Sequence, residues 1–122
     1  MKKYVLVLAL MSVSGLYAAD ITIISNAFAS GSMVSLAANM DTEIDFALQG
    51  KAQKMNGAQA IAQLTRFVET NKPAGFTVAH HADKKETGFL VGKLATDNGE
   101  FRVNVTYAVK NDKIIIQSIR IE

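Results

Sequence analysis

Four consecutive strand-like segments in the C-terminal part of the chain constrain its fold most strongly. Two of the connections between them, Asp97-Asn98-Gly99 and Asn111-Asp112, contain residues that tolerate positive φ, as tight hairpins require. Such spacing predicts a meander, in which each strand pairs with the one before it. The expected strands cover residues 75–81, 88–96, 101–110 and 113–121.

The N-terminal half contains three expected helices. Apolar residues recur every three or four positions over residues 21–40, which predicts two short helices, with Gly31 as the C-cap of the first and Ser32 as the N-cap of the second. Asn56 opens a third helix, Gln59 completes a capping box, and Pro73 marks its end. The apolar stripe of this helix comprises Ala60, Ile61, Leu64, Phe67 and Val68.

Residues 41–49 alternate between apolar and polar side chains, as a half-buried strand does. Gly50 allows a turn, and residues 51–55 are expected as a short return strand. The order is therefore helix, helix, strand, strand, helix and four strands. This order predicts an α+β fold with three N-terminal helices packed on a strongly bent antiparallel sheet.

The first nineteen residues have the three regions of a bacterial secretory signal peptide. Lys2 and Lys3 precede an apolar run over residues 4–13, and the small residues Ala18 and Ala19 follow. A membrane anchor is the alternative, but the run is about half of the roughly 20 apolar residues that a spanning helix needs. We expect cleavage after Ala18 or Ala19, one domain over residues 20–122, no membrane anchor after cleavage, and a periplasmic or secreted location.

Composition narrows the classes of partner and chemistry. The chain is 49% hydrophobic, 20% charged and free of cysteine, which is the composition of a globular domain without disulfides or a lipidated N-terminal Cys. The net charge of +2 comes from Lys2 and Lys3, because the remaining basic side chains equal the 11 acidic ones in number. Neutral charge and the absence of a basic patch with aromatic residues argue against nucleic acid.

The order of elements is also that of the nuclear transport factor 2-like (NTF2-like) fold, in which a bent sheet curls around a long helix to form a cone. Residues 26–31 (Asn-Ala-Phe-Ala-Ser-Gly), 36–38, 92–103 and 119–122 resemble the small secreted proteins of the DUF4783 family of domains of unknown function. The resemblance covers essentially all of residues 20–122 and implies the NTF2-like fold. The resemblance implies no catalytic residues, because the matching motifs consist of turn and core residues.

His80 and His81 are the only histidines. Adjacent strand residues point to opposite faces, so the two cannot ligate one metal ion without a bulge. If Phe76 and Val78 face inward, His80 does too and becomes a candidate general base. The alternative, favoured by the charged turn that follows, is that both imidazoles are solvated.

Asp45 is the second candidate base, with Tyr107 as its hydrogen-bonding partner, as in NTF2-like enzymes. Asp45 lies on the face opposite Phe46, so we favour a solvated acidic edge over a pocket. The acidic residues there also lack the glycine and spacing of a calcium site, and we expect neither metal nor cofactor. Arg102 and Arg120 could hold an anion, although pairing across strands is the favoured interpretation. The expected partners are Glu100, Asp97 and Glu122.

Three functions follow as hypotheses. The leading one is a non-enzymatic binding module for a small hydrophobic ligand or an envelope protein. The second is a small acid/base enzyme of isomerase or dehydratase type that uses Asp45 or His80 with Tyr107. The third is an interaction protein, a homodimer formed through the sheet, because the runs at 89–91 and 114–116 make both faces apolar. Residues expected to line a pocket are Phe46, Phe67, Phe76, Val78, Phe101, Val103 and Tyr107.

Overall fold

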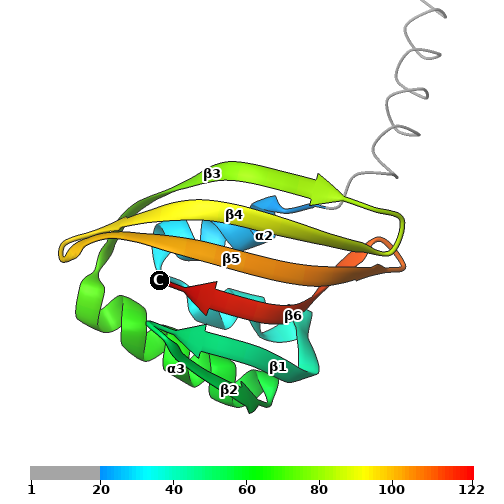
Figure 1. The fold of residues 1–122 in the computed structure, drawn as a ribbon, viewed down its shortest axis with the longest axis horizontal. Coiled ribbons are helices and arrows are strands. Elements are labelled where there is room, and N and C mark those ends of the chain that lie inside the picture. The colour runs from blue at the N-terminus through cyan, green and yellow to red at the C-terminus, as the bar shows by residue number, and fades with distance from the viewer. Residues whose placement is uncertain (1–19) are drawn as a thin grey trace, which may run out of the picture.

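The computed structural model describes residues 20–122, so the signal-peptide prediction lies outside the described residues. These residues form three helices and a curved six-stranded sheet (Figure 1). The elements in chain order are α2 (Thr22–Ser30), the 3-10 helix η1 (Met33–Asn39), β1 (Met40–Leu48), β2 (Lys51–Met55), α3 (Gly57–Asn71), β3 (Pro73–Asp83), β4 (Thr87–Thr96), β5 (Gly99–Lys110) and β6 (Lys113–Ile121).

Two of the predicted helix caps are confirmed and one is not. Gly31 caps α2 in the left-handed region, at φ 77°. The Asn56 side chain accepts a hydrogen bond from the Gln59 N–H (2.8 Å) and Gln59 Oε1 accepts one from the Asn56 N–H (3.1 Å), which confirms the capping box of α3. The expectation that Ser32 caps a second α-helix is wrong. Its side chain makes no cap hydrogen bond, and the element that follows is a 3-10 helix.

The sheet has the order β2-β1-β6-β5-β4-β3 (Figure 1). Four of its strand pairs are antiparallel, but β1 and β6 are parallel. The expectation of a wholly antiparallel sheet is therefore wrong. The meander β3 to β6 leaves one edge of β6 open, and β1 pairs with that edge. Local sequence patterns do not encode a pairing between segments so far apart in the chain.

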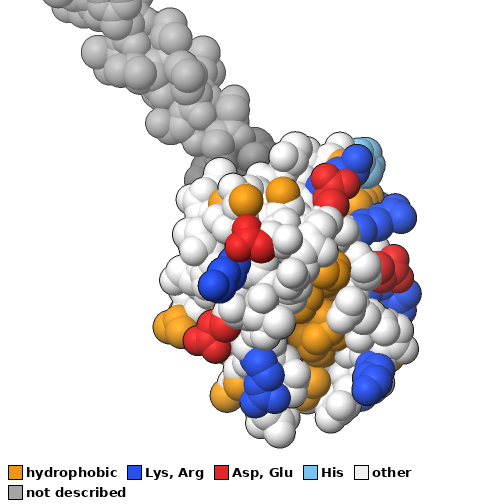
Figure 2. All heavy atoms as spheres, turned by 90° about the vertical axis from the view of Figure 1, so that its left-hand side faces the viewer, with side chains coloured by type: hydrophobic (Ala, Val, Ile, Leu, Met, Phe, Trp, Pro, Cys, Tyr) orange, Lys and Arg blue, Asp and Glu red, His pale blue; other side chains and the backbone are white. Residues whose placement is uncertain are grey.

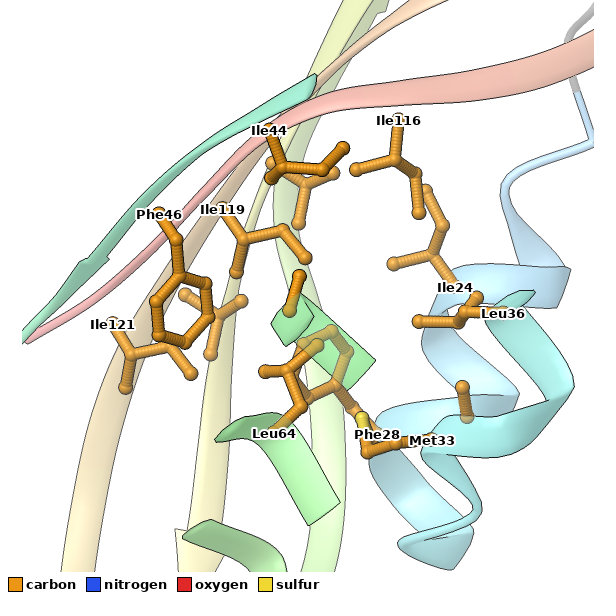
Figure 3. Close-up of a cluster of buried hydrophobic side chains, with 14 of the residues drawn as sticks. Ile24, Phe28, Met33, Leu36, Ile44, Phe46, Leu64, Ile116, Ile119 and Ile121 are labelled. Atoms are coloured by element: carbon orange, nitrogen blue, oxygen red, sulfur yellow. The ribbon is translucent and has the colours of Figure 1, made fainter. Parts of the chain in front are cut away.

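The helices cover one face of the sheet, called here the inner face (Figure 1). Across it runs the register row Leu48, Ile121, Val103, Gly92 and Val78. Figure 3 shows side chains of β1 and β6 pointing toward those of α2, η1 and α3. Fully buried members of this core include Ile24, Phe28, Leu36, Ile44, Leu64, Ile116 and Ile119.

The opposite, outer face is crossed by the register row Ala52, Ala47, Arg120, Asn104, Val91 and His80.

Two bulges decide which side chains face inward. Gln117 is an extra residue in β6, since Ser118 pairs with Thr106 and Ile116 with Tyr107. It allows Ile116 and Ile119 both to be buried in the core. Ala79 is the corresponding extra residue in β3, between Val78, which pairs with Gly92, and His80, which pairs with Val91. Beyond each bulge, the odd-numbered and even-numbered residues of the strand change places between the inner and outer faces.

Candidate functional site

The residues expected to line a pocket lie together, but they contact one another. Phe46, Phe67, Val103 and Tyr107 are buried, and Phe76, Val78 and Phe101 are half-buried. The Phe67 and Phe101 rings meet edge to face with centroids 5.0 Å apart, and Phe28 stacks on Phe76 at 5.3 Å. In this conformation the inner face is filled with core side chains.

Tyr107 contacts an inward carboxylate that the sequence did not indicate. Its hydroxyl donates a hydrogen bond to Asp83, at the end of β3. Burial first, and then the hydrogen bond to the Asp83 carboxylate and its charge, raise the pKa of the Tyr107 phenol above its usual range. A Cβ added to Gly88 would lie 2.5 Å from the Tyr107 ring, so only glycine leaves room for that ring.

The bulge at Ala79 explains why Asp83 was missed. Phe76 and Val78 do contact the core, as the sequence suggested, but the expectation that His80 then faces inward is wrong, because the extra residue moves His80 to the outer face. Asp83 takes the inward register position opposite Gly88. One signal was available: Gly88 and Gly92 share a face of β4, where each leaves room for an aromatic ring.

Both histidines are exposed, which confirms the solvated interpretation. His80 lies against Phe89 on the outer face, with ring centroids 5.4 Å apart. The structure therefore does not bring His80 and Tyr107 together.

Asp45 also lies on the outer face, away from Tyr107. Its carboxylate is 3.3 Å from the Lys54 ammonium, and both side chains are about two-thirds exposed. Glu43 is 4.0 Å from the same Lys54. The expected solvated acidic edge is confirmed, with Lys54 as its counter-charge.

Two hollows lie on the outer face. One, of about 530 Å³, lies over β2, β1 and β6 and is lined by residues including Asp45, Ala47, Lys54 and Arg120. The other, of about 370 Å³, lies over β3, β4 and β5 and is lined by Ala79, Val91, Gly92, Lys93, Glu100, Phe101, Arg102 and Glu122. Charged side chains of both signs line each hollow.

Asn104 of β5 lies in the outer-face row between Val91 and Arg120. Its Oδ1 atom is shielded from solvent and accepts no hydrogen bond within the described part of the chain. Buried side-chain acceptors are normally paired, so this atom is an exception among the described residues.

Arg120 lies 3.4 Å from Glu122, two residues along the chain, so one of the expected acidic partners is present but the pairing is not across strands. Basic and acidic side chains are also interspersed at the end of the molecule shown in Figure 2, around a band of hydrophobic side chains. The described surface there has no field of one sign that would attract a polyanion.

The outer face also carries apolar side chains. Phe89, Val91 and Ile115 are half-buried there, while their neighbours Leu90, Ile114 and Ile116 are fully buried in the core. The expectation that both faces of these strands are apolar is thus confirmed.

Other kinds of site find little support between residues 20 and 122. No group of three or more His, Cys, Asp or Glu side chains within this range could hold a metal ion. No helix in the same range is long and apolar enough to cross a membrane.

Solved structures with the same fold include two proteins called DUF4783 family proteins. The one from Bacteroides ovatus is 34% identical, with a TM-score of 0.76 over 80% of this chain and 89% of that one. The one from Bacteroides uniformis is 30% identical, with a TM-score of 0.77 over 81% and 92%. No curated protein matches.

More distant structures share the fold alone. A putative polyketide cyclase from Sinorhizobium meliloti is 7% identical, with a TM-score of 0.63 over 84% of this chain and 92% of that one. A designed NTF2 protein is 14% identical, with a TM-score of 0.68 over 84% and 92%. The family model for DUF4783, a domain of unknown function, matches residues 21–122. The chain belongs to the DUF4783 family, and its fold is NTF2-like.

Proposed function

We propose that this protein is an exported, non-enzymatic interaction module that binds a protein partner through the outer face of its sheet. One observation carries the proposal: the inner face is filled with buried side chains, whereas hollows of about 530 and 370 Å³ lie over the outer face. A ligand inside the fold would have to separate the Phe28–Phe76 and Phe67–Phe101 pairs. A partner on the outer face needs no such rearrangement.

Export is part of the proposal and rests on the sequence. The basic, apolar and small-residue regions of residues 1–19 direct the chain to the periplasm or the medium. Because the chain has no cysteine, folding there does not depend on disulfides.

Photo-crosslinking tests which face binds. A photoreactive amino acid is placed at Ala47 or at Lys93, one in each outer-face hollow, and at the exposed Arg66 on α3 as the matched control. We expect crosslinked protein adducts in the host cells from Ala47 and Lys93 and none from Arg66. Adducts from Arg66 alone, or from no position, would contradict the proposal.

The hydrogen bond between Tyr107 and Asp83 favours a second candidate, an acid/base enzyme. It meets one requirement of such a site, an inward carboxylate in contact with the tyrosine. Against it, Tyr107 is fully buried, and its raised pKa keeps the phenol protonated and donating to Asp83. This arrangement suits a structural latch, in which the hydrogen bond ties the end of β3 to β5 across β4.

Absorbance titration separates the latch from an open site, because Tyr107 is the only tyrosine in residues 20–122 and the chain has no tryptophan. For the latch we expect no phenolate signal until the protein unfolds at high pH. A phenolate that appears reversibly in the folded protein near pH 10, the ordinary value for tyrosine, would favour the enzyme.

A further inference from the structure

We propose that the protein partner adds an extended segment to the free edge of β3, as one further strand of the sheet. This inference rests on the proposed function, because it names the way in which a protein partner of the outer face binds. β3 is an edge strand, and within residues 20–122 no strand pairs with its far side (Figure 1). An unpaired edge presents backbone N–H and C=O groups, and another extended chain carries the groups that match them.

The two edges of the sheet differ in how well they are protected from such pairing. The opposite edge strand, β2, has five residues, and two of them are the lysines Lys51 and Lys54. Short length and lysine side chains both discourage pairing at an edge. β3 has eleven residues without Lys, Arg or Glu, and its one acidic residue, Asp83, is the last of the strand. The edge of β3 is therefore the one that can pair with a partner over several residues.

The hydrogen-bonding pattern of the sheet determines which backbone groups of β3 point outward. In antiparallel pairs, alternate residues of a strand direct their backbone groups to one neighbour or to the other. Arg102 of β5 and Glu122, which follows β6, exchange two backbone hydrogen bonds of 2.9 Å, so the odd-numbered residues of β5 face β4. The register of β4 with β5 then directs the odd-numbered residues of β4 toward β3. The 2.6 Å hydrogen bond from the Lys84 N–H to the Thr87 carbonyl agrees with this assignment.

The backbone groups of Phe76, Val78 and His81 point away from β4. Their neighbours Thr77 and His80 pair with odd-numbered residues of β4 and so direct their own N–H and C=O groups toward that strand. No backbone hydrogen bond from another element reaches Phe76, Val78 or His81 within the described part of the chain. Each of these residues therefore offers one donor and one acceptor to an added strand.

The side chains along this edge favour an amphipathic partner segment. On the inner side, Phe76 and Val78 are half-buried and pack against the core. On the outer side, Thr77 and His80 are exposed. Successive side chains of an added strand alternate between the two faces. Its apolar residues would cover Phe76 and Val78, and its polar residues would lie beside Thr77 and His80.

Charge and shape beside the edge specify the partner further. Lys84 and Lys85, in the turn after β3, are exposed, and the ion pairs of the described residues do not include them. An acidic residue at the matching end of the added strand would pair with these lysines. The hollow over β3, β4 and β5 is lined by Ala79 of the same edge strand, so a partner in this hollow also reaches the edge.

Amide hydrogen exchange of the protein as its host produces it tests the edge before any partner is added. We expect the N–H groups of Phe76, Val78 and His81 to exchange rapidly, because they have no backbone partner. The N–H groups of Thr77 and His80 should exchange slowly, because they face β4. Slow exchange at Phe76, Val78 and His81 in the dilute protein would show that the edge is already covered, and would overturn the proposal.

The binding probe is the acetylated synthetic peptide Glu-Thr-Val-Thr-Val-Thr-Val-Glu, which alternates polar and apolar residues and has an acidic residue at each end. At about 1 mM it should slow exchange at Phe76, Val78 and His81 about 3-fold, because bound molecules are protected. Phe76 and Val78 report on the edge before the bulge, and His81 reports on the edge after it. The control peptide has proline in place of each valine, so it cannot donate to the edge and should have no effect.

A pair of variants at one position separates backbone pairing from side-chain contact. His81→Pro removes the outward N–H, and proline is tolerated on an edge strand where its nitrogen faces solvent. It should weaken peptide binding about 5-fold, the loss of one hydrogen bond. His81→Ala removes the same side chain but keeps the N–H, so it should bind as the wild type does. If His81→Pro fails to fold, as judged by circular dichroism, Lys84→Glu with Lys85→Glu takes its place and should weaken binding by charge repulsion.

The outcomes distinguish this inference from the proposed function. No protection by the alternating peptide, or equal binding by the two His81 variants, overturns strand addition. Protection that appears without peptide as the protein is concentrated would overturn it too, because a second copy then occupies the edge. If Ala47 and Lys93 still crosslink to another protein in cells, the outer face remains the binding surface and only the strand addition was wrong. If they give no adduct, the proposed function fails.

Discussion

The inner and outer faces of one sheet are built from alternate residues of the same strands, yet they differ in packing. On β5, Val103 and Val105 are completely buried, while the outward-facing Arg102 and Thr106 on either side of this pair are exposed. Inner-face contacts are mostly apolar and include one hydrogen bond, between Tyr107 and Asp83, whereas the outer face has hollows lined by charges of both signs. We infer from this difference that the inner-face contacts stabilise the fold. The outer face is then available to bind the proposed protein partner.

Truncation of one phenylalanine on each face gives the largest expected contrast. Phe28→Ala removes a fully buried ring that stacks on Phe76, and we expect it to lower the free energy of unfolding by about 3–5 kcal/mol. Phe89→Ala removes a half-buried ring from the outer face and should cost about 1 kcal/mol. Urea denaturation measures both, and equal losses would remove the distinction between the faces.

Two glycines test how tightly the inner face is packed. A methyl group at Gly92 would lie 2.2 Å from the tip of the Phe76 ring, which Phe28 holds in place, so Gly92→Ala should cost about 1–3 kcal/mol. Gly75→Ala on β3 is the matched control, because no atom lies within 4 Å of its added methyl group. Thermal unfolding should rank the two. A harmless Gly92→Ala would mean that the interior has spare room.

Tyr107→Phe probes the one buried phenol on the inner face. Loss of the hydrogen bond to Asp83 should cost about 1–2 kcal/mol at neutral pH. The folded-state pKa of Tyr107 is raised, so its stabilisation is complete below the unfolded value of about 10 and is lost as pH rises above it. The difference between wild type and Tyr107→Phe should therefore shrink above about pH 10, by about 1.4 kcal/mol per pH unit. A difference that stays constant to pH 12 would show that the phenol titrates normally.

Lys54→Ala should have the smallest effect. Its ion pairs with Asp45 and Glu43 are about two-thirds exposed, so we expect a change below about 0.5 kcal/mol that disappears in 1 M salt. A larger loss in the free energy of unfolding that persists in 1 M salt would show that these exposed ion pairs stabilise the fold, which their exposure does not indicate.

The sequence was informative where a few neighbouring residues determine the structure. The capping box at Asn56, the left-handed cap at Gly31, and the Asn111-Asp112 turn, with φ of 52° and 63°, all follow from side-chain or backbone preferences of those residues. The bounds of β2 and β6 were predicted without error for the same reason.

The features that the sequence did not reveal depend on distant partners or on one inserted residue. Nothing about Ala79 itself marks a bulge, yet that residue sends His80 outward and leaves Asp83 beside Tyr107. The parallel pairing of β1 with β6 joins segments from opposite ends of the described chain. The predicted pocket residues were correctly grouped, but periodicity cannot tell a lined cavity from a filled core, because both need inward apolar side chains.

Native mass spectrometry of the protein, purified from its own host without denaturation, tests the division between the faces most directly. We expect a mass that whole chains alone account for and no retained small molecule, since the inner face is filled with core side chains. A retained small molecule would contradict the filled interior.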